Sequence, residues 1–214
     1  MQVAIIGAGS FGTVLADIAA HNQCQVMMYA RRPEMVHAIN AFHRNPQYHP
    51  DLQLHASITA SSDLAEVVRG ADLVLLSVPS RAMDAICQAL AKVLAPDVAL
   101  LSTTKGIQSE GFQLMSQIIG QRLPSHPVGV LSGPNLAHEI ATRHLTASVV
   151  ASQSPQVRQL AREAFATKYF RLYSSEDLIS VELGGALKNI YAIAAGLADG
   201  LGVGQNTKAL FITQ

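Results

Sequence analysis

The chain opens on a buried strand, a glycine-rich loop and a helix, and this order restricts the fold more than any other feature. The three segments are an apolar run, then Gly-Ala-Gly-Ser-Phe-Gly, then a helix-forming stretch, at residues 3–6, 7–12 and 13–20. In that context the spacing G-x-G-x-x-G indicates dinucleotide binding. Gly7 permits the tight turn, Gly9 lets the backbone approach a pyrophosphate, and Gly12 lets the helix pack on the strand. The hexapeptide alone also fits an ordinary glycine turn, so the flanking strand and helix decide in favour of a nucleotide.

Composition excludes several classes of protein. Hydrophobic residues make up 49% and charged residues 14% of the 214 residues, which is enough for a packed core and argues against long disorder. Lys+Arg and Asp+Glu both number 15, whereas a nucleic-acid binder normally has a basic excess. No apolar run reaches the length of a membrane span, and the immediate first strand leaves no room for a signal peptide. We therefore expect a soluble, cytoplasmic protein without a nucleic-acid partner.

Cysteines and histidines provide no framework for a disulfide or a metal site. Cys24 and Cys87 lie in apolar stretches and are expected to be small buried side chains. The eight histidines lack the spacing of metal ligands, and we expect surface or loop positions for them. They are His21, His37, His43, His49, His55, His126, His138 and His144.

Strand patterns alternate with helix patterns along most of the chain. Strands are expected at residues 3–6, 25–30, 72–78, 98–102, 128–131, 147–151 and 169–173. Helices are expected at residues 13–20, 33–39, 63–68, 80–94, 111–122, 135–142 and 155–166, and an irregular segment at 43–61. This alternation predicts an α/β fold with a Rossmann-type, doubly wound, mostly parallel sheet. We expect a dinucleotide-binding domain at residues 1–175 and the start of an all-α substrate domain at 176–214.

The end of the second strand indicates which nucleotide is bound. An acidic residue about 20 positions past the glycines would bind the ribose 2′-hydroxyl of NAD. Arg31 and Arg32 stand there instead, and guanidinium groups suit a 2′-phosphate. The pair favours NADP(H) without excluding NAD(H). The alternative is that both arginines only solvate the end of a strand.

Polar segments follow three further strands. They are residues 77–80, 103–106 and 132–135, and ligands of open parallel sheets sit beyond the carboxyl ends of the strands. Lys105 is a point charge suited to a phosphate or carbonyl oxygen, although a lysine before a glycine is usually a solvated turn. Gly133-Pro134-Asn135 at a helix start leaves amides free for an anion. Because these segments share one edge of the predicted sheet, we expect them to form one site.

A long helix is expected after the polar caps at residues 174–177. Its apolar residues recur every three or four positions and predict one buried stripe, at Leu183, Leu187, Ile190, Ala194, Leu197 and Leu201. Lys188 borders this stripe, and Gly184 and Gly185 on its own face would leave it room. Two adjacent glycines cost a helix about 2 kcal/mol relative to alanine, so we expect that room to be used.

With Asn189 beside it, Lys188 suits a general acid to a carbonyl group. The alternative is a lysine that extends to solvent from a helix–helix contact.

These motifs together resemble the NAD(P)-dependent glycerol-3-phosphate dehydrogenase family, in its bacterial form. The matching segments, in chain order, are residues 7–13, 78–80, 105–106, 132–134, 182–189 and 194–209. The segment Glu-Leu-Gly-Gly-Ala-Leu-Lys-Asn at 182–189 is far more specific than the glycine loop. The resemblance implies an oxidoreductase that interconverts dihydroxyacetone phosphate and sn-glycerol 3-phosphate with NADPH or NADH and supplies glycerophospholipid synthesis.

Site residues follow from the motifs and the resemblance together. The resemblance implies that Lys188 is the catalytic acid/base. The expected substrate contacts are Lys105, Gly133, Asn135, Lys188 and Asn189. The expected cofactor contacts are Gly7, Gly9, Ser10, Phe11, Gly12, Arg31, Arg32, Pro79, Lys105 and Ala137. The expected partners are these small molecules, with a homodimer left open.

The chain departs from the family pattern in three places. Phe11 stands where the family often has Trp, and Gln214 where it usually has Arg. The chain stops at Gln214 in a helical segment, whereas the family continues for roughly another hundred residues, a domain-sized stretch. In the family, that stretch holds an Asp near the catalytic lysine and a Ser-Arg-Asn motif for the substrate phosphate. We therefore expect residues 1–214 alone to be inactive. The alternatives are another β-hydroxyacid-type dehydrogenase and a regulatory nucleotide-binding module.

Overall fold

The computed structural model describes residues 1–109 and 111–213, and its centre is an eight-stranded sheet in the order β10-β9-β8-β7-β6-β1-β2-β5. The strands are β1 Gln2–Ile6, β2 Gln25–Tyr29, β5 Thr59–Ser61, β6 Leu73–Leu76, β7 Ala99–Ser102, β8 Val128–Ser132, β9 Thr146–Ser152 and β10 Phe170–Ser175. Neighbouring strands run parallel, except that β8 and β9 are antiparallel. The predicted Rossmann-type, mostly parallel sheet is confirmed.

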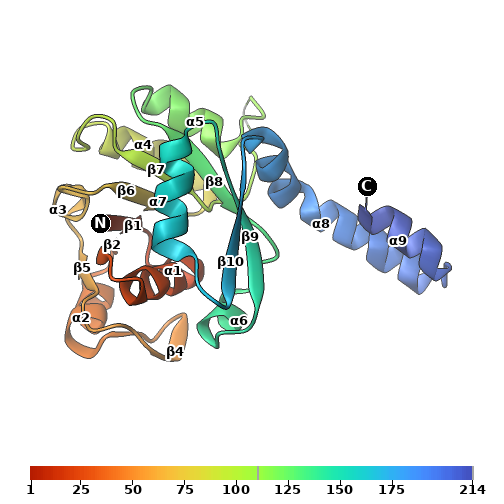
Figure 1. Cartoon of the computed structure of the whole chain (residues 1–214), viewed down its shortest axis with the longest axis horizontal. Coiled ribbons are helices and arrows are strands. Elements are labelled where there is room, and N and C mark those ends of the chain that lie inside the picture. The colour runs from red at the N-terminus through yellow and green to blue at the C-terminus, as the bar shows by residue number, and fades with distance from the viewer. Residues whose placement is uncertain (110, 214) are drawn as a thin grey trace.

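Helices cover both faces of the sheet (Figure 1). They are α1 Ser10–His21, α2 Pro33–Phe42, α3 Leu64–Val68, α4 Met83–Leu90, α5 Met115–Arg122, α6 Ala137–Ala141 and α7 Pro155–Phe165, with a 3-10 turn η1 at Ser80–Ala82. Successive side chains of a strand point to opposite faces, so β1 places Val3 and Ile5 in one apolar cluster and Ala4 and Ile6 in the other. The first cluster includes residues of α1, α2 and α7, and the second includes residues of α3, α4 and α5.

Both cysteines are free and buried, as predicted. Cys24 lies in the first cluster and Cys87 in the second, on opposite faces of the sheet. Burial raises the pKa of Cys87 to about 12, because the apolar interior disfavours the thiolate. Neither thiol is therefore a candidate nucleophile.

The segment expected to be irregular contains three strands. Strands β3 Arg44–Asn45 and β4 His49–Gln53 form an antiparallel hairpin, and β5 is the edge strand of the main sheet. The sequence does not reveal them, because they are short, rich in polar residues and only partly buried.

Three expected helices are shorter than predicted. The helix expected from residue 111 begins at Met115, since Gly111 and Phe112 have φ of +80° and +51°, outside the helical region. The helix expected at 80–94 starts with the turn η1 and ends with α4 at Leu90. The helix expected at 135–142 is confined to α6.

The long C-terminal helix forms as expected but does not bury the predicted stripe. Helix α8, Leu178–Gly200, is capped by the Asp177 carboxylate, which accepts from Ser180 N at 3.0 Å. It runs away from the body of the sheet, and α9, Gln205–Thr213, folds back beside it (Figure 1). Beyond its first turns most apolar residues are therefore exposed, for example Ile190 at 63%, Leu197 at 65% and Leu201 at 73%.

Helix α8 is long and apolar enough to cross a membrane, judged by length and composition alone. The expectation that no apolar run reaches the length of a membrane span is therefore wrong. Among the described residues α8 is the one helix that passes this test, with a mean hydropathy of 1.2. Its leucines, isoleucines and alanines raise that value. A single such helix carries little weight, because core helices of soluble proteins pass the same test.

Candidate active site

A cleft of about 780 Å³ lies at the carboxyl ends of β1, β2, β6 and β7. This glycine-loop cleft is lined by nine of the residues singled out in the sequence: Gly7, Gly9, Ser10, Phe11, Arg31, Arg32, Pro79, Lys105 and Asn135. Segments from four strand ends therefore meet at one edge of the sheet, as expected of a parallel α/β fold.

Glycine stands at each of the three loop positions for a different structural reason. Gly7 has φ of +119°, and a Cβ there would lie 2.3 Å from the Ser77 carbonyl oxygen. A Cβ on Gly12 would lie 2.3 Å from the carbonyl oxygen of Gly7, so this glycine lets α1 pack against the loop. A Cβ on Gly9 would meet nothing within 4 Å, so Gly9 faces the open cleft. Gly12 is buried and supports the cleft from behind, without lining it.

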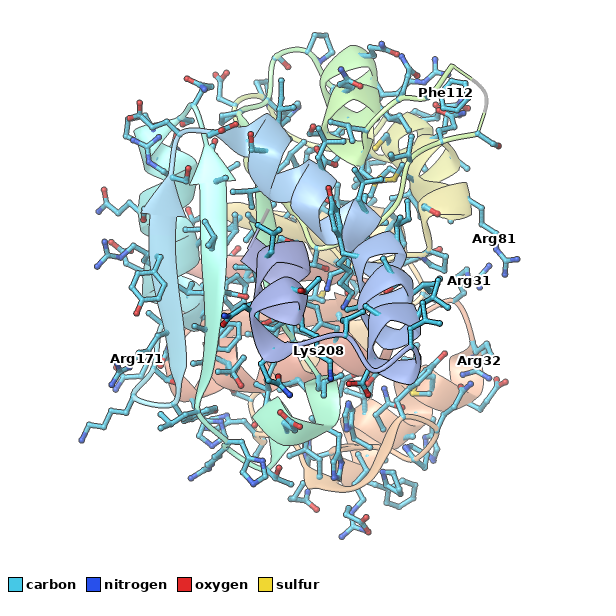
Figure 2. The ribbon with its side chains drawn as sticks, turned by 90° about the vertical axis from the view of Figure 1, so that its right-hand side faces the viewer. Arg31, Arg32, Arg81, Phe112, Arg171 and Lys208 are labelled. Atoms are coloured by element: carbon cyan, nitrogen blue, oxygen red, sulfur yellow. The ribbon has the colours of Figure 1, made fainter. Side chains whose placement is uncertain are left out.

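Three arginines gather at the same edge of the molecule (Figure 2). Arg31 and Arg32 follow β2, Arg81 comes from η1, and all three line the glycine-loop cleft. Arg32 is held by its guanidinium, which donates to the side-chain oxygen of Gln47. The cleft thus presents three positive charges to a ligand.

Arg81 and Tyr48 also line the cleft and are absent from the sequence prediction. The signal for Arg81 was its position directly after the polar segment 77–80. Tyr48 gave no comparable signal, because it sits in the turn of the unpredicted β3–β4 hairpin.

Two lysines converge beside the cleft. Lys105 is half-buried, and its Nζ donates to the Gly133 carbonyl oxygen at 3.3 Å. Burial lowers the pKa of Lys105, and the positive charge of the neighbouring Lys188 lowers it further. Lys188 itself is exposed on α8, so the predicted buried setting for this side chain is wrong in the described structure. The neighbouring Asn189 is exposed as well, and neither residue lines the cleft.

The segment after β8 contributes one side chain to the cleft. Asn135 Nδ2 donates to Ser148 Oγ at 2.6 Å, while its Oδ1 is buried without a hydrogen-bond partner among the described atoms. Gly133 lets the chain pass close to β9, since a Cβ there would lie 2.8 Å from the Ala147 carbonyl oxygen. Ala137, expected at the cofactor, instead packs against the first apolar cluster outside the cleft wall.

The two glycines of α8 do not make room for Lys188, contrary to the sequence interpretation. A Cβ on Gly185 would lie 2.4 Å from Ser132 Oγ at the end of β8, so this glycine permits close approach of helix and strand. A Cβ on Gly184 would meet nothing within 4 Å. The missing side chain of Gly185 therefore serves the docking of α8 on the sheet.

Glu182 is a buried carboxylate that the sequence reading passed over. It lies in the second turn of α8 and is 5% exposed. Its Oε1 accepts from Ser116 N at 3.0 Å, and its Oε2 accepts from Ser116 Oγ, at the start of α5. Burial raises the pKa of Glu182, and the hydrogen bonds from Ser116 oppose that shift. The signals in the sequence were an acid in a largely apolar helix and its position at the start of the segment 182–189.

Comparison with known proteins assigns this architecture to a family. The family model described as "NAD-dependent glycerol-3-phosphate dehydrogenase N-terminus" matches residues 2–158, and the model of the corresponding C-terminus matches residues 177–214. The chain belongs to the NAD-dependent glycerol-3-phosphate dehydrogenase family. The resemblance on which the sequence interpretation rested is confirmed.

Individual members of the glycerol-3-phosphate dehydrogenase family match along the whole chain. Glycerol-3-phosphate dehydrogenase [NAD(P)+] of Teredinibacter turnerae is 44% identical over 214 residues, covering 100% of this chain and 63% of the relative. The structure of the Coxiella burnetii glycerol-3-phosphate dehydrogenase has a TM-score of 0.87 and 33% identity, covering 99% of this chain and 65% of that one. The Plasmodium falciparum glycerol-3-phosphate dehydrogenase has a TM-score of 0.90 and 28% identity, covering 98% and 62%. The chain thus spans less than two thirds of these relatives.

Proposed function

We propose that this protein interconverts dihydroxyacetone phosphate and sn-glycerol 3-phosphate with a nicotinamide dinucleotide as cofactor. The observation that carries this proposal is the convergence of Lys105 and Lys188 beside the glycine-loop cleft. Family membership supports it, since relatives named glycerol-3-phosphate dehydrogenase [NAD(P)+] match the whole chain. Another β-hydroxyacid-type dehydrogenase is not favoured, because the match includes the segment around Lys188.

The division of labour within the chain follows from the same observations. We propose that residues 1–175 bind the dinucleotide and that residues 176–214 begin the part that acts on the substrate. From family membership we also propose a cytoplasmic location and a role in supplying glycerophospholipid synthesis. A homodimer remains a hypothesis.

The cleft fits a dinucleotide on chemical grounds. Gly9 leaves the loop open to a pyrophosphate, and the N-terminus of α1 directs free backbone N–H groups toward the same place. Arg31 and Arg32, with Arg81 nearby, would hold the 2′-phosphate of NADP(H). The reduced nicotinamide ring supplies the hydride when the cofactor is bound.

The two lysines would serve the substrate. A positive charge at Lys188 places a proton donor beside the site, and we propose that its ammonium group gives a proton to the ketone oxygen. Lys105, fixed by the carbonyl of Gly133, orients the polar end of the substrate, assisted by Asn135. Asn189 stays a predicted substrate contact on the exposed side of α8.

Turnover of dihydroxyacetone phosphate by the complete protein tests the proposed activity. Oxidation of NADPH or NADH that depends on this substrate, followed by absorbance, is the expected result. Binding of cofactor with no substrate-dependent oxidation in the complete protein would favour the regulatory module instead.

We expect Arg31 and Arg32 to discriminate between the two cofactors. Replacing both by Ala should weaken NADPH binding by about 1–3 kcal/mol, the range for lost hydrogen bonds to a charged group, and NADH binding much less. Lys168→Ala is a matched control, because it removes a positive charge outside the residues that line the cleft. Titration of the reduced nicotinamide fluorescence measures both affinities, and equal losses for the two cofactors would contradict the assignment.

A further inference from the structure

His49 occupies a position that the sequence interpretation did not foresee for any histidine. It is the first residue of β4 and is 6% exposed, whereas all histidines were expected at the surface or in loops. It lies in the β3–β4 hairpin, which packs against the glycine loop. The same hairpin supplies Asn45, whose Nδ2 donates to the Ala8 carbonyl oxygen at 3.1 Å and to Thr13 Oγ1 at 2.7 Å. The hairpin therefore fixes the loop from behind.

The contacts of His49 with Ser10 define which atom carries the proton. Nε2 of His49 lies 3.0 Å from the carbonyl oxygen of Ser10, which can only accept a hydrogen bond. Nε2 must therefore carry a hydrogen. The same nitrogen lies 2.9 Å from Ser10 Oγ, so the hydroxyl oxygen also accepts from it. A protonated Nε2 has no lone pair for the serine hydrogen, and the Ser10 O–H must find its acceptor elsewhere.

Ser10 has one open direction in which to donate. It is the first residue of α1, it lines the glycine-loop cleft, and no other acceptor for its hydroxyl is found among the described residues. The cleft wall around it consists of the loop glycines and the helix N-terminus, which favour a negatively charged group. A phosphate oxygen in the cleft would complete the hydrogen bonds of Ser10.

We propose that His49 is a positioning residue of the dinucleotide site: its Nε2–H holds Ser10 so that the serine hydroxyl donates to the pyrophosphate of the bound dinucleotide. The inference rests on the proposed function, because it requires a dinucleotide in the glycine-loop cleft. It assigns a role to a side chain that touches neither cofactor nor substrate and acts only through Ser10.

His49→Leu and His49→Gln separate this role from packing. Leu fills a similar volume without a donor, and Gln keeps an amide N–H that can reach Ser10. We expect His49→Leu to weaken NADPH binding roughly tenfold, about one hydrogen bond to a charged group, and His49→Gln to restore most of the affinity. His144→Leu, at an exposed position, is the matched control and should bind as the original protein does.

Two further measurements decide the mechanism of any loss. Adenosine 2′-monophosphate carries the phosphate for Arg31 and Arg32 but has no pyrophosphate, so its affinity by calorimetry should not change in His49→Leu. In a Ser10→Ala background, His49→Leu should cost nothing more, since its effect passes through that hydroxyl. Equal losses for both ligands, or additive losses in the double variant, would overturn the inference. Failure of the original protein to bind NADPH would instead refute the proposed function, and the inference with it.

Discussion

Lys188→Ala should lower kcat for reduction of dihydroxyacetone phosphate by about 10²–10⁴-fold in the complete protein, the usual contribution of a general acid. Cofactor affinity should change little, because Lys188 does not line the glycine-loop cleft. Lys188→Arg should not restore the rate, since a guanidinium group keeps its proton at any working pH. Steady-state kinetics with each variant, beside nucleotide titration, measures both quantities.

The alternative is that Lys188 is a structural lysine, and its removal would then lower stability and leave kcat nearly normal. Because Lys188 is exposed, we instead expect Lys188→Ala to leave the melting temperature nearly unchanged. Its charge is also one of the causes that lower the pKa of Lys105, and Lys188→Ala should therefore raise that pKa toward the ordinary lysine value. An NMR titration of isotopically methylated lysines tests this coupling. Normal turnover in Lys188→Ala would end the catalytic assignment.

The first strand, loop and helix could be predicted because each glycine has a local reason that the spacing states directly. A Cβ added to Gly7 or to Gly12 would lie 2.3 Å from a backbone oxygen, so neither position accepts another residue. Buried parallel strands such as β6 and β7 read as continuous apolar runs, which a sequence shows plainly. Most of the wall of the glycine-loop cleft followed from these two signals, except Tyr48 and Arg81.

The hairpin and the long helix could not be predicted for different physical reasons. The β3–β4 hairpin owes its place to single polar contacts, such as those of Asn45 and His49, which leave no periodic pattern. For α8 the periodicity correctly indicated a helix but not what covers it, and Ile190 and Leu197 are exposed. Periodicity identifies an apolar face, whereas its burial depends on elements elsewhere in the structure.

Glu182→Ala should release α8 from the sheet. The substitution leaves Ser116 N and Ser116 Oγ without their acceptor at the start of α5, where helix N–H groups have no partner within the helix. An unsatisfied buried donor costs about 1–3 kcal/mol, so we expect a loss of about 2–6 kcal/mol for the two, measured by urea unfolding. Because α8 carries Lys188, turnover should fall together with stability. Glu176→Ala removes an exposed carboxylate from the same region and should cost well under 1 kcal/mol.

Comparison with Glu182→Gln separates the effect of the charge of Glu182 from that of its hydrogen bonds with Ser116, and we expect the difference to depend on pH. Burial raises the pKa of Glu182 in the folded protein above its ordinary value of 4.5, so the folded state binds this proton more tightly than the unfolded state does. The contribution of Glu182 to stability is therefore fully present below pH 4.5 and is lost as pH rises through the raised pKa. Gln does not titrate, and other groups cancel in the comparison of the two proteins. The stability advantage of Glu182 over Gln should thus be largest in acid and shrink toward neutral pH. A difference that stays constant across this range would show that Ser116 and the helix N-terminus balance the cost of burying the carboxylate, and one that grows with pH would show that they outweigh it.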